Sequence, residues 1–209
     1  MAEQAHPYTP RYAHESVEER FDETLQSGFF SLERRHYRHR RFDGGWSERV
    51  LREVHVRHDA VGVLLYDPQR DCVVHVEQIR AGALDDPQSP WKLEPVAGLV
   101  DAGETGAEVA RRESMEEAGC EIGELIELYT YYPSPGACTE RVTLFCGLVD
   151  SDGVGGVHGL ESENEDIQVH VLSFAQTWAL LEQGVIDNAM SLIALNWLVR
   201  ERASLRARR

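Results

Sequence analysis

A helix with both of its ends marked lies near the middle of this 209-residue chain, between segments that read as β-strands. Thr105 is a favourable N-cap residue, and Glu108, three positions later, completes a capping box. Gly119 is the typical residue just beyond a helix C-terminus. The sequence therefore predicts a helix from residue 105 to about 118, within an α+β layered arrangement that has a mixed sheet.

The segments before this helix alternate with a period of two residues. The first twenty or so residues are polar and show no periodicity, so we expect a loosely held arm there. Residues 28–57 read as a long β-hairpin around the turn Asp43-Gly44-Gly45. A second hairpin is expected at 60–67 and 72–80, followed by a short strand at 91–96.

The segments after the helix continue the layered pattern. Strands are expected near 124–132, 141–149 and 167–172, with a loop rich in glycine and acid before the last of them. Two closing helices are expected at about 174–183 and 189–203. We expect two domains: an arm and hairpin domain at 1–57, and a main domain at 58–209.

Composition narrows the class of partner and the compartment. With 42% apolar and 27% charged residues the chain should fold, and its net charge of −15 makes a long polyanion such as duplex DNA or RNA an unfavourable partner. Eight arginines within residues 34–57 still leave room for a local anion site. The sequence has no run of membrane-span length, no signal pattern and no CxxC pair, so we expect a cytoplasmic protein with reduced cysteines.

Three glutamates crowd one edge of the expected helix. Glu113 and Glu117 are four residues apart and face the same way, with Glu116 beside them, and like charges at that spacing repel. One interpretation is a solvated surface helix. The other is a site for a hard cation such as Mg²⁺, which prefers carboxylate and carbonyl oxygens.

The whole stretch resembles the Nudix box. That pattern is glycine, five residues, glutamate, seven residues, then Arg-Glu-aliphatic-any-Glu-Glu-any-Gly-aliphatic. All of its fixed positions are matched here, by Gly98, Glu104, Arg112, Glu113, Glu116, Glu117 and Gly119. The departures are Ser114 and Cys120, which stand at positions that are usually aliphatic and bear on packing rather than on metal chemistry.

Beyond the box, the chain from Gly28 onward is most similar to the bacterial ADP-ribose pyrophosphatases. That group carries a proline about sixteen residues after the last glycine of the box, and Pro135 stands at that distance from Gly119. An ordinary Pro-Gly turn is the alternative. The resemblance implies an α/β/α sandwich with a mixed sheet plus a small N-terminal sheet domain. It also implies Mg²⁺-dependent hydrolysis of ADP-ribose to AMP and ribose 5-phosphate, with Mn²⁺ as the alternative ion.

The resemblance assigns residues to the chemistry. Glu163, in an acidic loop, would be the catalytic base. The expected metal ligands are the Ala97 carbonyl with Glu113, Glu117 and Glu165, and Glu116 as a shared or accessory ligand. Without the box, we would interpret the acidic loop as solvated.

The resemblance also implies a substrate site and a homodimer with exchanged N-terminal domains. The expected substrate contacts are Phe29, Phe30, Arg52, Glu53, Arg57, Arg80, Leu99, Ser134, Pro135, Gly136 and Glu140. Guanidinium groups suit phosphates and aromatic rings suit adenine. The alternatives are a core position for each phenylalanine and a solvated strand position for most arginines.

Two other functions remain open. The enzyme could act on another nucleoside diphosphate sugar such as GDP-mannose. A sensor that binds ADP-ribose without hydrolysis ranks lower, because such modules commonly lose box carboxylates and this chain retains them all.

Overall fold

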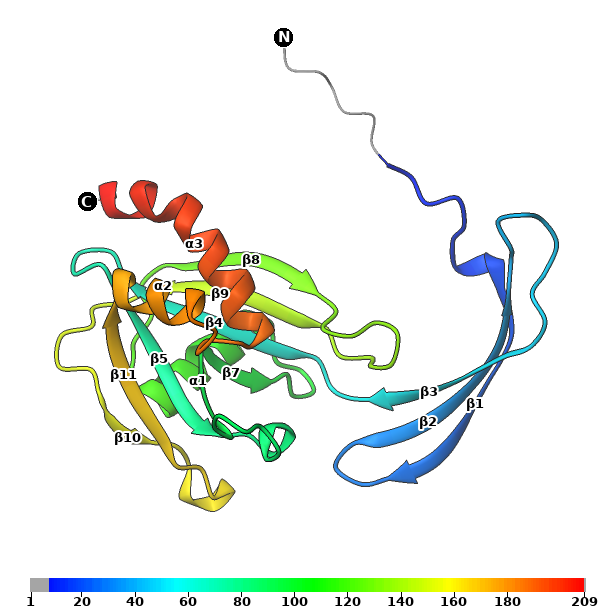
Figure 1. Ribbon diagram of the computed structural model, residues 1–209, viewed down its shortest axis with the longest axis horizontal. Helices are drawn as coiled ribbons and strands as arrows, with labels where there is room; N and C mark the ends of the chain where they lie inside the picture. Colours follow the sequence, from blue (N-terminus) through cyan, green and yellow to red (C-terminus); the bar gives the residue numbers. More distant parts are fainter. Residues whose placement is uncertain (1–7, 209) are drawn as a thin grey trace, which may run out of the picture. The chain divides into compact units, whose positions relative to one another are not determined.

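The computed structural model describes residues 8–208, without the side chains of Glu19, Phe21 and Glu163. The chain divides into two compact units (Figure 1). The first comprises the chain up to Arg57 together with Ser134–Thr139, and the second comprises His58–Pro133 and Glu140–Arg209.

The first unit is an antiparallel sheet. It contains β1 (Val17–Ser27), β2 (Ser31–His39) and β3 (Val50–Val56), in that order, after a short 3-10 turn at His14–Ser16. The expected hairpin is confirmed as β2 and β3. The expectation of a loose arm is wrong from Val17 onward, because β1 begins there. Register shifts between Glu18 and Phe21 and between Thr24 and Gln26 break the alternation by which a strand is recognised.

This first sheet has little core of its own. Among its described residues Val54 is the only buried hydrophobic one, and Phe29, Phe42 and Leu51 are exposed. A sheet of this size normally needs an apolar surface to pack against. The sheet therefore retains apolar surface that a further layer could cover.

Ser134–Thr139 joins the first unit through β3. The His55 amide donates to the Ala137 carbonyl at 2.8 Å, and the Thr139 amide donates to the His55 carbonyl at 3.1 Å. The Arg57 amide also donates to Thr139 Oγ1 at 2.9 Å. Thus a loop from far along the chain completes the edge of this small sheet.

The second unit is built on an eight-stranded mixed sheet. Its main path runs β10-β11-β5-β4-β9-β8, while β6 pairs with β5 and β7 pairs with β4. The β4–β9 pair is parallel and the other pairs are antiparallel. The strands are β4 (Ala60–Asp67), β5 (Cys72–Ile79), β6 (Trp91–Glu94), β7 (Val96–Leu99), β8 (Leu125–Tyr131), β9 (Val142–Leu148), β10 (Gly156–His158) and β11 (Ile167–Ser173).

Helices cover both faces of this sheet (Figure 1). On β4, Val61 and Val63 pack in the cluster that contains Val109 of α1 (Gly106–Ala118), whereas Leu64 packs in the cluster that contains Leu195 of α3 (Ala189–Ala207). Helix α2 (Phe174–Glu182) also contributes to this second cluster, through residues that include Phe174 and Trp178. The expected α/β/α sandwich with a small N-terminal sheet is confirmed.

Three details differ from the expected elements. The segment 91–96 forms two strands, because Pro95 cannot continue the hydrogen-bond ladder of β6. The short strand β10 was missed within the glycine-rich loop, and α3 continues to Ala207. All four cysteines are free, and no described helix is long and apolar enough to cross a membrane.

Asp67 closes the β4–β5 turn from a buried position. Its Oδ1 accepts hydrogen bonds from the amides of Gln69 and Arg70, at 2.8 and 3.0 Å. Its Oδ2 accepts from the Ser151 amide and hydroxyl, at 3.0 and 2.7 Å. Burial alone raises the pKa of Asp67, but these bonds outweigh it and hold the pKa well below its ordinary value.

We expect Asp67→Asn to lower the free energy of unfolding by about 2–3 kcal/mol at neutral pH, because the amide cannot accept all of these bonds. The wild type loses the same contribution as the pH falls below about 4, where the carboxylate is protonated in the unfolded chain, so the two proteins should converge in acid. Urea denaturation at several pH values measures both effects. The exposed Asp85→Asn is the control, and equal stability of Asp67→Asn and Asp85→Asn at neutral pH would contradict the prediction.

Candidate active site

Helix α1 is fixed at both ends as the sequence predicts. Thr105 Oγ1 accepts from the Glu108 amide at 3.3 Å, and the Glu108 carboxylate accepts from the Thr105 amide at 2.8 Å. Gly119 ends the helix in the left-handed region, with φ 62°, and its amide donates to the Met115 carbonyl at 3.0 Å. These caps set which carboxylates of the helix face β7.

Arg112 links the loop before the helix to the helix itself. Its guanidinium donates to both carboxylate oxygens of Glu104, at 3.1 and 3.2 Å. It also donates to Glu113 at 2.8 Å and to Glu116 at 3.2 Å. One arginine thus partly neutralises three box carboxylates and holds them in place by hydrogen bonds.

Gly98 brings the backbone of β7 against Glu113. A Cβ added at Gly98 would overlap the Glu113 carboxylate, so only glycine permits this approach. Burial raises the pKa of Glu113, Arg112 opposes that rise, and the charges of Glu116 and Glu165 add to it. The Glu113 carboxylate therefore lies where additional positive charge would stabilise its ionised form.

Glu117 is the most deeply buried box carboxylate, at 3% exposure. It accepts a hydrogen bond from the Ala97 amide at 3.1 Å, and Gln78 Nε2 lies 3.5 Å from its other oxygen. Its pKa is raised to about 8, mainly by burial and also by the charge of Glu113, against the lowering effect of the Ala97 amide. A buried carboxylate beside like charges is the kind of group that a cation stabilises.

Glu165 belongs to the same electrostatic group, although it lies far along the chain. Its charge raises the pKa of both Glu113 and Glu117. Its carboxylate accepts from the Leu160 amide at 3.1 Å, which fixes it within the loop before β11. The side chain of Glu163, the expected base, lies outside the described part of the structure.

The donor chemistry of this group fits a hard divalent cation. Its side-chain donors are carboxylate oxygens, and two of them have raised pKa values. Among the described side chains, which exclude that of Glu163, no three His, Cys, Asp or Glu residues already converge on one point. A cation would therefore draw these carboxylates together, in competition with Arg112 for Glu113 and Glu116.

The expected substrate residues fall in both units. Arg80, Leu99 and Glu140 lie in the second unit, where Glu140 is buried and Arg80 pairs with Glu94. In the first unit, the Arg57 guanidinium lies 4.5 Å from the centre of the Phe30 ring. Phe30 is in edge contact with Phe29, which is 78% exposed.

The remaining expected contacts of the first unit lie at its surface. Arg52 and Glu53 are exposed on β3, and Glu53 pairs with Arg34 at 3.3 Å. Ser134, Pro135 and Gly136 are also exposed, in the loop that joins β3. The exposure of Phe29 excludes a core position for that residue, whereas Phe30 is half-buried.

Sequence reasoning missed Gln78 and Glu94, which contact Glu117 and Arg80. Both face α1, on β5 and β6, because Gln78 follows the core residue Val76 by two positions and Glu94 pairs with Val76 in register. The signal available in the sequence is the change from apolar to polar at alternate positions of β5. The pairing of β5 with β6 could not be read from that signal.

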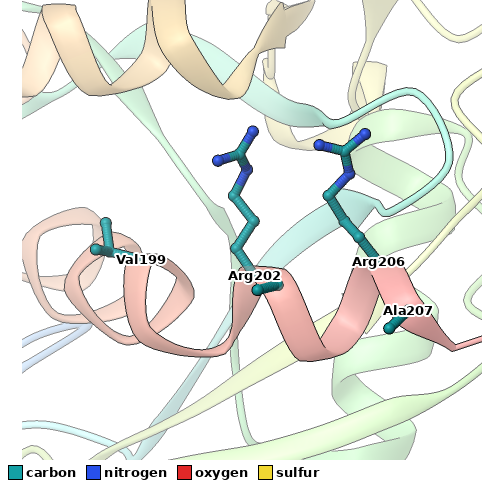
Figure 2. A pocket seen from close by; sticks show the side chains of 5 residues that line it. Val199, Arg202, Arg206 and Ala207 are labelled. Carbon is teal, nitrogen blue, oxygen red and sulfur yellow. The ribbon is translucent and has the colours of Figure 1, made fainter.

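A hollow of about 520 Å³ lies along α3 (Figure 2). The residues that line it, from Val199 to Ala207, are far along the chain from the box carboxylates. Arg202 and Arg206 project from the helix on the side of the hollow, and both pair with Asp71. Asp71 also accepts from the Tyr66 hydroxyl at 2.8 Å. These arginines therefore tie α3 to the β4–β5 turn, and we assign the hollow no role in the chemistry.

We expect Gly98→Ala to weaken metal binding without unfolding the protein, because the methyl group displaces the flexible Glu113 side chain. The dissociation constant for Mn²⁺, followed by electron paramagnetic resonance, should rise about tenfold or more. Gly82→Ala is the matched control, since its Cβ would meet no atom within 4 Å. Equal Mn²⁺ affinity of the two variants would show that the close approach at Gly98 is dispensable.

The chain is similar in sequence to a protein domain family and to known pyrophosphatases. Residues 56–191 match the model of the NUDIX domain. The chain is 48% identical over 176 residues to the ADP-ribose pyrophosphatase of Escherichia coli strain K12, covering 84% of each protein. It is 33% identical over 178 residues to the GDP-mannose pyrophosphatase of Escherichia coli O1:K1 / APEC, covering 85% of this chain and 92% of that protein.

A solved structure shares the fold. The crystal structure of an ADP compounds hydrolase superposes with a TM-score of 0.67 and 22% identity, covering 93% of this chain and 99% of that one. The family assignment rests on the domain match and on the box residues that surround Gly98 and Arg112. The chain belongs to the Nudix family, whose hydrolases generally need a divalent metal.

Proposed function

We propose that this protein is an ADP-ribose pyrophosphatase that hydrolyses ADP-ribose to AMP and ribose 5-phosphate. The observation that carries this proposal is the 48% identity to an ADP-ribose pyrophosphatase over 84% of both chains. The retention of all box carboxylates, with Glu113 and Glu117 desolvated at one edge of α1, supports hydrolysis over binding alone.

Mg²⁺ is the proposed cofactor. The Ala97 carbonyl, Glu113, Glu117 and Glu165 would hold it, with Glu116 as an accessory ligand. When bound, the ion supplies positive charge that offsets the charge of the pyrophosphate and lowers the pKa of a bound water. Arg112 neutralises part of the remaining box charge and holds Glu104 through a two-pronged ion pair.

The protein residues provide the proton transfer and the orientation. Glu163 accepts the proton of the attacking water, whose oxygen forms a bond to one phosphorus as the bridging P–O bond breaks. Arg52, Arg57 and Arg80 bind the phosphates and the terminal ribose, while Phe29 and Phe30 stack on adenine. Glu53, Leu99, Ser134–Gly136 and Glu140 supply the other substrate contacts.

We expect the purified protein to release AMP from ADP-ribose only when Mg²⁺ or Mn²⁺ is present. Glu163→Gln should lower kcat by about 10²–10⁴-fold, because the amide cannot take the proton. Glu117→Gln should lower activity through weaker metal binding, so part of it should return at high Mg²⁺. Coupled detection of AMP measures all three proteins, and the exposed Glu121→Gln is the control.

A substrate panel separates the other functions. A higher kcat/KM for GDP-mannose than for ADP-ribose would make GDP-mannose the preferred substrate, and the protein would still be a hydrolase. Tight binding of ADP-ribose with no metal-dependent product would favour the sensor instead. Full activity of Glu163→Gln would remove that residue from the mechanism.

We also propose a cytoplasmic homodimer with exchanged N-terminal units. The nearly coreless first sheet supports this, since Val54 is its only buried hydrophobic residue among those described and a partner subunit would cover its exposed apolar side chains. Light scattering should give a mass near twice 23.6 kDa. A monomer mass at micromolar concentration would contradict the exchange.

A further inference from the structure

The face of the sheet that meets α1 changes from apolar to polar at the end of β5. Val74 and Val76 pack in the core with Val109, and Gln78 and Arg80 follow at the same alternation. Glu94 of β6 pairs in register with Val76, so its side chain belongs to the same face. A short polar row thus continues the core toward Glu117.

Glu94 is a buried carboxylate that holds one side of Arg80. It is 7% exposed, and its Oε2 accepts from Arg80 Nε at 2.5 Å. Among the described residues neither side chain makes another hydrogen bond or ion pair. Because the bond uses Nε, both terminal nitrogens of the guanidinium remain available as a fork.

That fork lies close to the candidate metal site. Gln78, two residues before Arg80 on the same face, approaches Glu117 at 3.5 Å. The charge of Arg80 also lowers the pKa of Glu117, which places the guanidinium within electrostatic reach of that carboxylate. Arg80 is 37% exposed and so remains accessible to a ligand in solution.

We propose that Glu94 is a positioning residue, which holds Arg80 by Nε so that its two terminal nitrogens bind the pyrophosphate of the substrate. This inference rests on the proposed function for the identity of the ligand. A buried carboxylate fixes an arginine better than a solvated one, because water competes less for its oxygens. Glu94 itself does not touch the substrate.

A double-mutant cycle tests the proposal. The dissociation constant of ADP-ribose is measured calorimetrically in EDTA, where no hydrolysis occurs, for wild type, Glu94→Gln, Arg80→Ala and the double variant. We expect Glu94→Gln to weaken binding about tenfold, and the double variant to bind no more weakly than Arg80→Ala alone. With Mg²⁺, the same variants should show a raised KM and a smaller change in kcat.

The matched control is Glu77→Gln, a carboxylate on the other face of β5 that pairs with His170 at 2.7 Å. It should bind ADP-ribose as the wild type does. Thermal unfolding checks that each variant folds. If Glu94→Gln does not fold, Glu94→Asp replaces it, with an expected loss of about threefold because the shorter side chain draws Arg80 back.

Two results would overturn the role of Glu94. One is a dissociation constant of Glu94→Gln within twofold of the wild-type value. The other is a fold-loss of affinity in the double variant equal to the product of the fold-losses in the two single variants. Failure of the proposed function looks different. In that case wild type releases no AMP from ADP-ribose, and the cycle is repeated with inorganic pyrophosphate as the ligand. Additive losses for pyrophosphate would then overturn the positioning role independently.

Discussion

The absence of a side chain at Gly98 allows helix α1 to lie directly against β7. Glu113 occupies the space that a Cβ would fill, and Glu117 reaches the Ala97 amide one residue earlier on the strand. This close contact removes water from two carboxylates that are on the same helix edge. Their raised pKa values follow from that desolvation and from neighbouring negative charge, which Glu116 and Glu165 supply to Glu113, and Glu113 and Glu165 supply to Glu117.

Such a cluster costs free energy, and the fold offsets part of the cost. Arg112 donates hydrogen bonds to Glu104, Glu113 and Glu116, so one positive charge partly neutralises three negative charges. Among the described residues Glu117 has no ion-pair partner, and it depends on hydrogen bonds from the Ala97 amide and Gln78 and on the charge of Arg80. The unbalanced negative charge would give this edge its affinity for the proposed cation, at the expense of stability in the metal-free protein.

Local signals in the sequence predicted α1 closely, because the capping box and Gly119 each act within a few residues. The order of elements predicted a layered α+β arrangement with a mixed sheet, and the resemblance to the Nudix family supplied the α/β/α sandwich. In contrast, β1 was missed because two register shifts hide its alternation, and β10 because glycine dominates its loop. The Arg80–Glu94 bond joins residues 14 apart and depends on how β5 pairs with β6, which no local pattern encodes. The resemblance named the box residues but gave no account of their hydrogen bonds.

The attachment of Ser134–Thr139 to β3 makes the first unit discontinuous in sequence. A unit assembled from two separate segments cannot be gained or lost by a single cut at one end of a gene. Removing the chain before His58 would remove His55, to which the Ala137 carbonyl and the Thr139 amide are hydrogen-bonded. These two backbone groups would then form hydrogen bonds with water instead. The small sheet and this loop are therefore expected to change together over evolution, even though 76 residues separate Arg57 from Ser134.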